Sequence, residues 1–340
     1  MPSGMNAEQE IQRVAVIGTG YMGGGMAQSF ALAGAHVQLA DVDSEATRRS
    51  LERLLAEGAL FEAAGLFPAG STDLLRERLH AAESIEEACT DVDFVEEAVF
   101  EDPAVKLEVL RRIDAAVKPG TIVGTNTSTI PVKVLSAAFA DPSRFLTVHF
   151  SNPAPFIPGV EIVAGEHTDP AVVATVEAFV ARMGRRSARS ADVPGFVLNR
   201  LQFVLLKEAM AVVQEGIATP ADVDTIVSTT FGFRLPFFGP FGIADMAGLD
   251  VYAKGFAVLE GGLGERFTAP QVLTDLVADG KYGTKTGEGF YSLDAEQRDE
   301  LVAYRNNAYV RMQQLIDELG PSPLQRSVAS TSDPSDEPAS

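Results

Sequence analysis

Two groups of residues in this chain have types and spacings that could support chemistry. In the first, Gly18, Gly20 and Gly23 follow a short apolar run and precede a helix-like run. Gly18 can take a tight turn, Gly20 lets the backbone approach a pyrophosphate, and Gly23 lets the helix pack closely on the strand. The helix N-terminus then offers free N–H groups to phosphates. We expect a dinucleotide-binding turn to which Tyr21 and Met22, between its glycines, also contribute.

An acidic residue further along the chain indicates which dinucleotide is bound. A second apolar run, residues 36–40, ends at Asp41, about 20 residues beyond the glycines, as a ribose-binding carboxylate does. This carboxylate accepts hydrogen bonds from ribose hydroxyls and repels a 2′-phosphate, and Val42 and Asp43 offer no arginine to receive one. The sequence therefore predicts NAD, and not NADP, as the cofactor.

The second group consists of polar residues beside later apolar runs. Ser128 and His149 stand at the ends of two runs, Glu161 lies within the next, and Asn199 opens a long apolar stretch. Ligands of an α/β sheet bind at the carboxyl ends of its strands. An imidazole suits the removal of a hydroxyl proton near neutral pH, and a carboxylate behind it fixes its tautomer. Glu161 would be costly to bury unpaired, so a partner is expected.

Each residue of the second group also has an ordinary structural explanation. Ser128 and Asn199 could cap helices, since Asn199 closely follows a Pro-Gly pair. A single histidine such as His149 is more often a core or surface residue than a catalytic one. The grouping of these residues with Glu161 nevertheless favours a site.

The elements that must position these residues alternate between strands and helices in the first half of the chain. The expected strands are residues 14–17, 37–40, 94–97, 121–124, 145–149 and 161–164. The expected helices between them include residues 23–32, 46–64, 104–116 and 131–139. This alternation predicts an α/β fold with a Rossmann-type doubly wound parallel sheet.

The pattern changes in the second half, where no convincing strand is visible. Helices are expected at residues 196–215, 221–230, 249–260 and 295–319. We therefore predict a Rossmann-type NAD-binding domain over residues 1–192 and a smaller all-helical substrate and dimerisation domain over residues 193–320. Residues 321–340 are rich in Pro and Ser and poor in large apolar residues, so a disordered tail is expected there.

The composition narrows the classes of partner. The 340 residues include 47 acidic and 27 basic ones, for a net charge of −20, which argues against binding to nucleic acid or to an anionic membrane. The single cysteine, Cys89, excludes an intrachain disulfide. The chain has no run of 18 apolar residues and a polar start, so we expect no membrane span and a cytoplasmic location.

Several motifs, spread in order over residues 12–292, make the chain resemble the L-3-hydroxyacyl-CoA dehydrogenase family, which includes the L-gulonate 3-dehydrogenase and lambda-crystallin branch. They are the glycine-rich turn, Asn126-Thr-Ser128, His149-Phe-x-Asn152-Pro153, Pro194-Gly-Phe-Val-x-Asn199-Arg200, Gly239-Pro-Phe and Lys285-Thr-Gly-x-Gly-Phe-Tyr291. A set of separate motifs in one order is far more specific than any one of them.

The resemblance implies a role for each matching residue. His149 would be the catalytic base with Glu161 as its carboxylate partner, and Ser128 and Asn199 would hold the substrate and the histidine. The residues implied to contact the dinucleotide are Glu101, Lys106, Ser128, Asn152 and Lys285. The resemblance also implies a homodimer, formed through the helical domain.

Some departures from the family pattern leave the substrate open. Residues 51–70 hold no Lys and only Arg53, where acyl-CoA enzymes often carry lysines that meet the CoA. The stretch before Gly239 is longer than usual and contains Arg234, as in the gulonate-type branch. The first expectation is a short 3-hydroxyacyl-CoA. The alternative is a free 3-hydroxy acid with Arg234 clamping its carboxylate, and a non-catalytic NAD-binding structural protein is the rival from another class.

Overall fold

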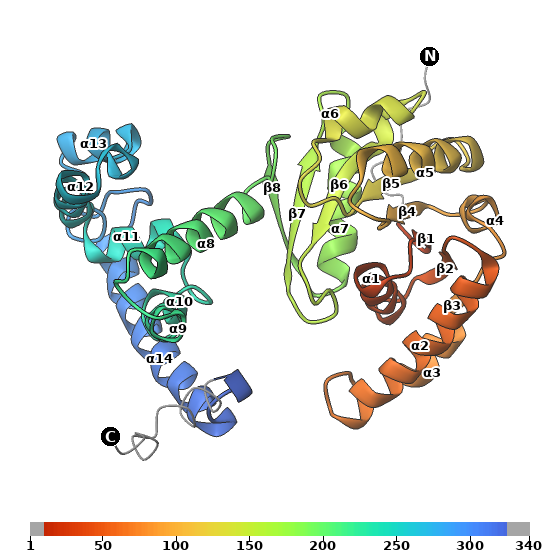
Figure 1. The fold of residues 1–340 in the computed structure, drawn as a ribbon, viewed down its shortest axis with the longest axis horizontal. Helices are drawn as coiled ribbons and strands as arrows, with labels where there is room; N and C mark the ends of the chain where they lie inside the picture. The colour runs from red at the N-terminus through yellow and green to blue at the C-terminus, as the bar shows by residue number, and fades with distance from the viewer. Residues whose placement is uncertain (1–9, 325–340) are drawn as a thin grey trace, which may run out of the picture. The chain divides into compact units, whose positions relative to one another are not determined.

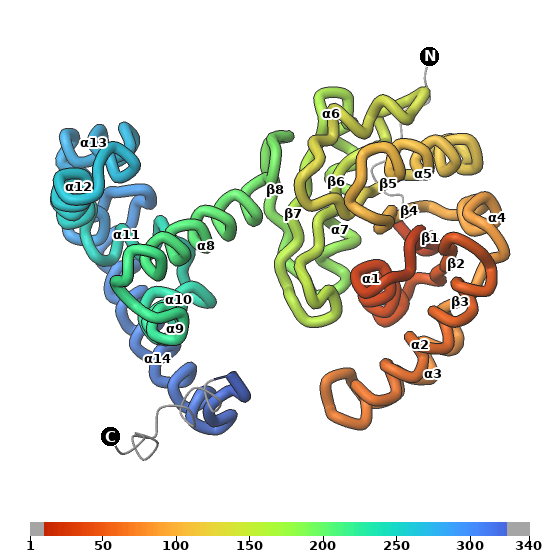
Figure 2. Tube along the Cα trace, viewed as in Figure 1, coloured from red at the N-terminus to blue at the C-terminus, as the bar shows by residue number. Residues whose placement is uncertain are grey.

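The chain folds into two compact units. The computed structural model describes residues 10–324, and the boundary between the units falls between Leu205 and Leu206, inside helix α8 (Leu198–Gln214). Figure 1 shows the helices and strands of each unit, and Figure 2 follows the course of the chain through them.

An eight-stranded sheet forms the centre of the first unit, with the strand order β3-β2-β1-β4-β5-β6-β7-β8. The strands are β1 (Arg13–Ile17), β2 (His36–Ala40), β3 (Leu79–Ala81), β4 (Phe94–Glu97), β5 (Ile122–Thr125), β6 (Phe145–Phe150), β7 (Gly159–Ala164) and β8 (Arg186–Ser190). All neighbouring pairs are parallel except β6 and β7. The expected Rossmann-type α/β fold is therefore confirmed.

Helices cover both faces of this sheet, and two separate apolar clusters fill the space beneath them (Figure 1). The helices are α1 (Tyr21–Leu32), α2 (Ser44–Ala63), α3 (Ser71–Arg78), α4 (Ile85–Cys89), α5 (Pro103–Ala116), α6 (Val132–Leu135) and α7 (Pro170–Arg182). Phe30 of α1 and Phe179 of α7 belong to one cluster, whereas Ile85 of α4 and Leu110 of α5 belong to the other. The sheet is thus packed against helices on both of its faces.

Two strands, β3 and β8, were not predicted from the sequence, and neither was the antiparallel direction of β7. β3 has only three residues, and β8 reads Arg-Ser-Ala-Arg-Ser, so neither contains an apolar run of the kind that marks a buried strand. β7 runs antiparallel to β6 because the connection, residues 151–158, contains no helix. A parallel neighbour needs a longer crossover connection.

Helices make up the second unit, as expected. The C-terminal part of α8 belongs to this unit. The helices that follow it are α9 (Pro220–Thr229), α10 (Phe231–Arg234), α11 (Pro240–Ala247), α12 (Leu249–Leu263), α13 (Gln271–Ala278) and α14 (Ala295–Leu319). Within the described residues of this unit, extended pairing is limited to isolated bridges from Glu288 to Gly283 and Ser292. The predicted tail lies outside the described residues from position 325 onward, and the predicted domain boundaries stay predictions. None of the helices in the described part of the chain is long and apolar enough to cross a membrane.

Candidate active site

The glycine-rich turn connects β1 to α1, and its glycines serve different purposes. Gly18 has a φ of +91°, and a Cβ added to it would lie 2.7 Å from the carbonyl oxygen of Ala98. A Cβ on Gly23 would lie 1.8 Å from the carbonyl oxygen of Gly18. A Cβ on Gly20, the residue before α1, would meet nothing within 4 Å. Gly18 and Gly23 are therefore required by packing, while Gly20 leaves open the approach to the helix N-terminus, where a pyrophosphate fits.

Asp41 lies beside this turn at the end of β2. Its Oδ2 accepts a hydrogen bond of 2.7 Å from the backbone N–H of Thr19 and another from the Thr19 hydroxyl. These bonds hold the carboxylate next to the glycines, the position expected of a carboxylate that binds the ribose of a dinucleotide.

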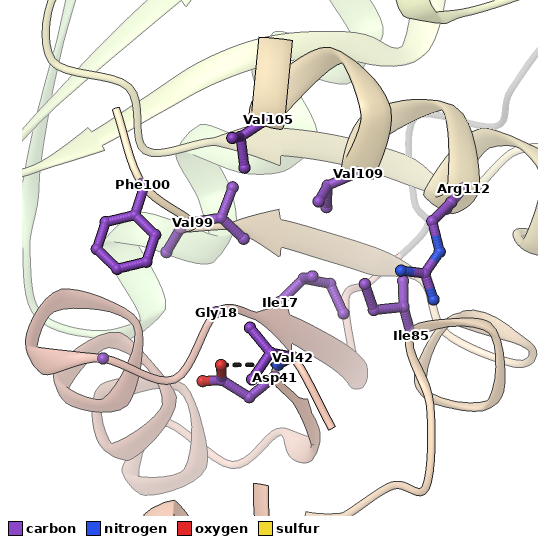
Figure 3. Close-up of a pocket in the computed structure, with 12 residues that line it drawn as sticks. Ile17, Gly18, Asp41, Val42, Ile85, Val99, Phe100, Val105, Val109 and Arg112 are labelled. Atoms are coloured by element: carbon purple, nitrogen blue, oxygen red, sulfur yellow. Dashed lines mark hydrogen bonds between the residues drawn. The ribbon is translucent and has the colours of Figure 1, made fainter. Parts of the chain in front are cut away.

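A pocket of about 450 Å³ opens in front of Asp41 (Figure 3). Its lining residues are Ile17, Gly18, Gly20, Asp41, Val42, Ile85, Ala98, Val99, Phe100, Val105, Val109 and Arg112. Val99, Val105 and Val109 face Asp41 from the opposite side of the pocket (Figure 3). A mostly apolar pocket with one carboxylate suits a flat base attached to a ribose, so these residues fit the adenosine half of NAD.

A buried ion pair stands behind the end of β4. Lys106 is 1% exposed, and its Nζ lies 2.8 Å from Oε1 of the fully buried Glu97. Oε2 of Glu97 accepts a 2.6 Å hydrogen bond from the Thr125 hydroxyl. Such a closed pair fixes the loop that follows β4, because removing either partner would leave an uncompensated buried charge.

Glu101, in that loop, organises the turn that contains Ser128. Its Oε1 accepts hydrogen bonds of 2.6 Å from the Thr127 hydroxyl and of 2.8 Å from the Ser128 N–H, and Lys106 Nζ lies 3.6 Å from Oε2. Burial raises the pKa of the Glu101 carboxyl, but these hydrogen bonds and the Lys106 charge outweigh it and leave the pKa below its usual value. Glu101 is therefore a carboxylate tied to the Ser128 turn.

His149 and Glu161 face each other on β6 and β7. The antiparallel register pairs the two residues directly, which places both side chains on one face of the sheet. His149 Nδ1 lies 2.8 Å from Glu161 Oε2, and the imidazole is 4% exposed. Because the carboxylate is bonded to Nδ1, it fixes the tautomer of the imidazole and leaves the other ring nitrogen, Nε2, to exchange a proton with a ligand.

The second oxygen of Glu161 holds the start of α8. Oε1 accepts hydrogen bonds from the N–H groups of Val197, at 3.0 Å, and Leu198, at 2.9 Å. Burial raises the pKa of the Glu161 carboxyl, but the hydrogen bonds that it accepts outweigh this effect and leave the pKa below its usual value. A charged carboxylate is well placed to stabilise an imidazolium.

Asn199 completes a continuous set of contacts in the first unit. It is the second residue of α8, and its Nδ2 donates a 2.8 Å hydrogen bond to the Ser128 carbonyl. Hydrogen bonds, some of them through neighbouring backbone, and one ion pair of 3.6 Å between Lys106 and Glu101 bring six residues together: His149, Glu161, Asn199, Ser128, Glu101 and Lys106.

Other residues singled out in the sequence lie elsewhere. Lys285 belongs to the second unit, where its Nζ lies 2.7 Å from Asp250 Oδ1. Arg234, at the end of α10, has a buried Nε with no hydrogen-bond partner within residues 10–324. Asn152 follows β6 and precedes Pro153 through a cis peptide bond.

At the start of α1, Tyr21 is exposed and Met22 is half-buried. Among the hydrogen bonds of residues 10–324, none that joins this turn uses either side chain.

Sequence reasoning gave no role to two residues of this region. Glu97 stands at the end of β4, so the strand-end rule that found Ser128 could have found it. Phe196 lies inside a motif that was recognised, but its ring centroid lies 5.9 Å from that of His149. That contact joins residues far apart in the sequence, and no local pattern reveals it.

Family models match both parts of the chain. The model described as 3-hydroxyacyl-CoA dehydrogenase, NAD binding domain, matches residues 13–193. The model described as 3-hydroxyacyl-CoA dehydrogenase, C-terminal domain, matches residues 195–293.

Whole proteins are similar over most of the chain. A 5-formyl-3-hydroxy-2-methylpyridine 4-carboxylate 5-dehydrogenase of Mesorhizobium japonicum is 34% identical over 309 residues, 90% of this chain and 99% of that protein. A probable 3-hydroxybutyryl-CoA dehydrogenase of Bacillus subtilis is 34% identical over 286 residues, 84% of this chain and 98% of that protein. The crystal structure of a 3-hydroxyacyl-CoA dehydrogenase from Archaeoglobus fulgidus superposes with a TM-score of 0.73 at 31% identity, covering 91% of this chain and 99% of that one.

Proposed function

Because the chain belongs to the 3-hydroxyacyl-CoA dehydrogenase family, an NAD-dependent oxidoreductase family, we propose that it interconverts a 3-hydroxy and a 3-oxo group through the His149–Glu161 pair. The observation that carries this proposal is the 2.8 Å contact between Nδ1 and Oε2. His149 takes the hydroxyl proton on its free ring nitrogen, and Glu161 orients the ring and stabilises its charged form. NAD, when bound, supplies the hydride acceptor.

Ser128, Asn199 and the cofactor residues have supporting roles in this proposal. Ser128 and Asn199 hold the substrate beside the histidine. Glu101, Asn152 and Lys285 contact the dinucleotide, and Asp41 selects NAD by repelling a 2′-phosphate. The buried Lys106 acts on the dinucleotide through the Glu101 carboxylate, which lies 3.6 Å from its Nζ. We also propose that the protein is a cytoplasmic homodimer formed through its helical part.

A short 3-hydroxyacyl-CoA is the first candidate substrate. The family models that match the chain are described as 3-hydroxyacyl-CoA dehydrogenase, and the Bacillus subtilis relative is named a probable 3-hydroxybutyryl-CoA dehydrogenase. The test is the formation of NADH from NAD with L-3-hydroxybutyryl-CoA and, separately, with free L-3-hydroxy acids. Turnover of neither class would contradict the proposed function.

A free hydroxy acid is the second candidate, and contacts in both units favour it. On α2, Arg48, Arg49 and Arg53 each form an ion pair with a glutamate, and no lysine that could meet a CoA phosphate lies within residues 51–70. Arg234, by contrast, has a buried Nε without a partner in the described part of the chain. A guanidinium binds carboxylates in a bidentate manner. The Mesorhizobium japonicum relative is, moreover, named for a pyridine carboxylate.

The variant Arg234→Met separates the two candidates. If Arg234 clamps a substrate carboxylate, the change abolishes turnover of the free acid and leaves that of the acyl-CoA nearly untouched. Arg311→Met is the matched control, because Arg311 is an exposed arginine of α14 in the same unit. Steady-state kinetics with both substrates provide the measurement. Equal effects of the two variants on the free acid would rule out the clamp.

A further inference from the structure

The backbone just before α8 has an unusual conformation next to the proposed catalytic pair. Gly195 has a φ of +75°, and the following residue, Phe196, has a φ of +47°. Among the described residues, Phe196 is the non-glycine residue with a positive φ. A bulky side chain rarely adopts this region, because it costs free energy, and such residues concentrate at functional sites. The surrounding structure must therefore hold Phe196 in place.

Burial and a ring contact hold the Phe196 side chain. It is 1% exposed and belongs to the apolar cluster that also includes Phe139, Phe145 and Val163. Its ring meets the His149 imidazole edge to face, with centroids 5.9 Å apart and an interplanar angle of 60°. The imidazole is thus bounded by the Phe196 ring and bonded at Nδ1 to Glu161.

The residues immediately after Phe196 hold the other member of the pair. The N–H groups of Val197 and Leu198 both donate to Glu161 Oε1. Consecutive residues therefore contact both His149 and Glu161. A right-handed conformation at position 196 would change the direction of the ring relative to the N–H groups that follow it. The positive φ is what lets a single segment serve both contacts.

We propose that Phe196 is a positioning residue for the reaction, whose ring keeps the His149 imidazole in line with Glu161 and shields one side of it from water. This inference rests on the proposed function of the His149–Glu161 pair. Phe196 touches neither substrate nor cofactor in this proposal and acts through His149.

Phe196→Leu, which removes the ring, is the test variant, and Phe139→Leu is its matched control. Phe139 is buried in the same cluster and stacks on Phe145 at 4.5 Å, with no ring contact to His149. Misplacing a catalytic group can cost about 10²-fold in rate. We expect Phe196→Leu to lower kcat by about this factor with unchanged NAD affinity, and Phe139→Leu to lower the melting temperature while keeping kcat. Phe196→Tyr, which keeps the ring, should restore most of the rate.

A double-mutant cycle with His149→Gln distinguishes positioning from general loss of packing. If Phe196 acts through the histidine, Phe196→Leu has no further effect on the residual rate of His149→Gln. Should Phe196→Leu fail to fold, Phe196→Met, of similar volume, replaces it in every measurement. Wild-type kcat in the variant without the ring, or an equal loss in the His149→Gln background, would overturn the inference. Wild-type turnover by His149→Gln itself would instead overturn the proposed function.

Discussion

The two units differ in how they cover their apolar residues. The first unit buries two extensive apolar clusters against its sheet. In the second unit, α9 and α10 contribute no buried side chain, and α11 to α14 contribute few. Leu206 and Met210 of α8 and Ile226 of α9 are instead 48%, 60% and 56% exposed. Exposed apolar side chains that gather in one patch mark interaction sites in folded proteins, so we expect an interaction site in the second unit.

The units also differ in the polar groups that they bury. The first unit buries Glu96, Glu97, Lys106 and His149. In the described part of the second unit, the buried polar residue is Asp245. Its carboxylate accepts hydrogen bonds from the N–H groups of Phe290, at 3.0 Å, and Tyr291, at 2.8 Å. Asp245 thus organises a loop, whereas the first unit concentrates groups that can titrate. We therefore expect the proposed chemistry to depend mainly on the first unit and the proposed assembly on the second.

The largest expected effect would come from removing the base of the first unit. His149→Gln should lower turnover by about 10²–10⁴-fold, the usual cost of losing a positioned general base, without changing NAD affinity. Steady-state kinetics and NAD titration provide the measurements. His36→Gln, on an exposed residue of β2, is the control. Unchanged turnover in His149→Gln would show that the reaction does not depend on this base of the first unit.

The role of the second unit in assembly is tested on its exposed apolar face. Met210→Asp places a charge on α8, and burying that charge in an interface is costly. If the homodimer forms through this helix, the variant should be monomeric at micromolar concentration while the wild-type protein is a dimer. Light scattering measures the change. Leu60→Asp, on a 69% exposed residue of α2 in the first unit, should leave the dimer intact. A monomeric wild-type protein would refute the proposed assembly.

A smaller effect is expected from Glu96, which faces the core of the first unit. Both of its carboxyl oxygens are buried without a hydrogen-bond partner within residues 10–324. Burial, reinforced by the charge of Glu97 and opposed by that of Lys106, raises the pKa of Glu96 well above 4.5. The folded state therefore keeps a proton that the unfolded state releases above pH 4.5.

The stability of the wild-type protein should accordingly fall as the pH rises from 4.5 towards the raised pKa of Glu96. The expected slope from this group is about 1.4 kcal/mol per pH unit. Glu96→Gln removes the titration, so the free energy of unfolding of the variant should exceed that of the wild type by an amount that grows with pH. Urea denaturation across this range measures it, with the exposed Glu52→Gln as control. Parallel curves for the wild type and Glu96→Gln would show that Glu96 carries no proton in the folded state.

Local patterns predicted the parts of the fold that depend on neighbours in the sequence. The glycine-rich turn, Asp41 and the residues at strand ends were found because strands, turns and their spacing are set by nearby residues. β8 was missed because it is a polar strand that pairs with β7 only in the folded sheet. The contact of Phe196 with His149 was missed because it joins residues far apart in the sequence, which meet only in the folded protein. Glu96 was missed because nothing in its neighbourhood signals that both oxygens lose water without gaining a partner.

The two oxygens of Glu161 have different partners, which limits the substitutions that this position can accept during evolution. One oxygen orients His149, and the other caps the first turn of α8. If the pair performs the proposed proton transfer, selection on that step and selection on the start of the helix act on the same side chain, and most substitutions there would impair both. Descendants that acquire new substrates should keep Glu161 and vary instead at positions such as Arg234, where a change carries no such double penalty.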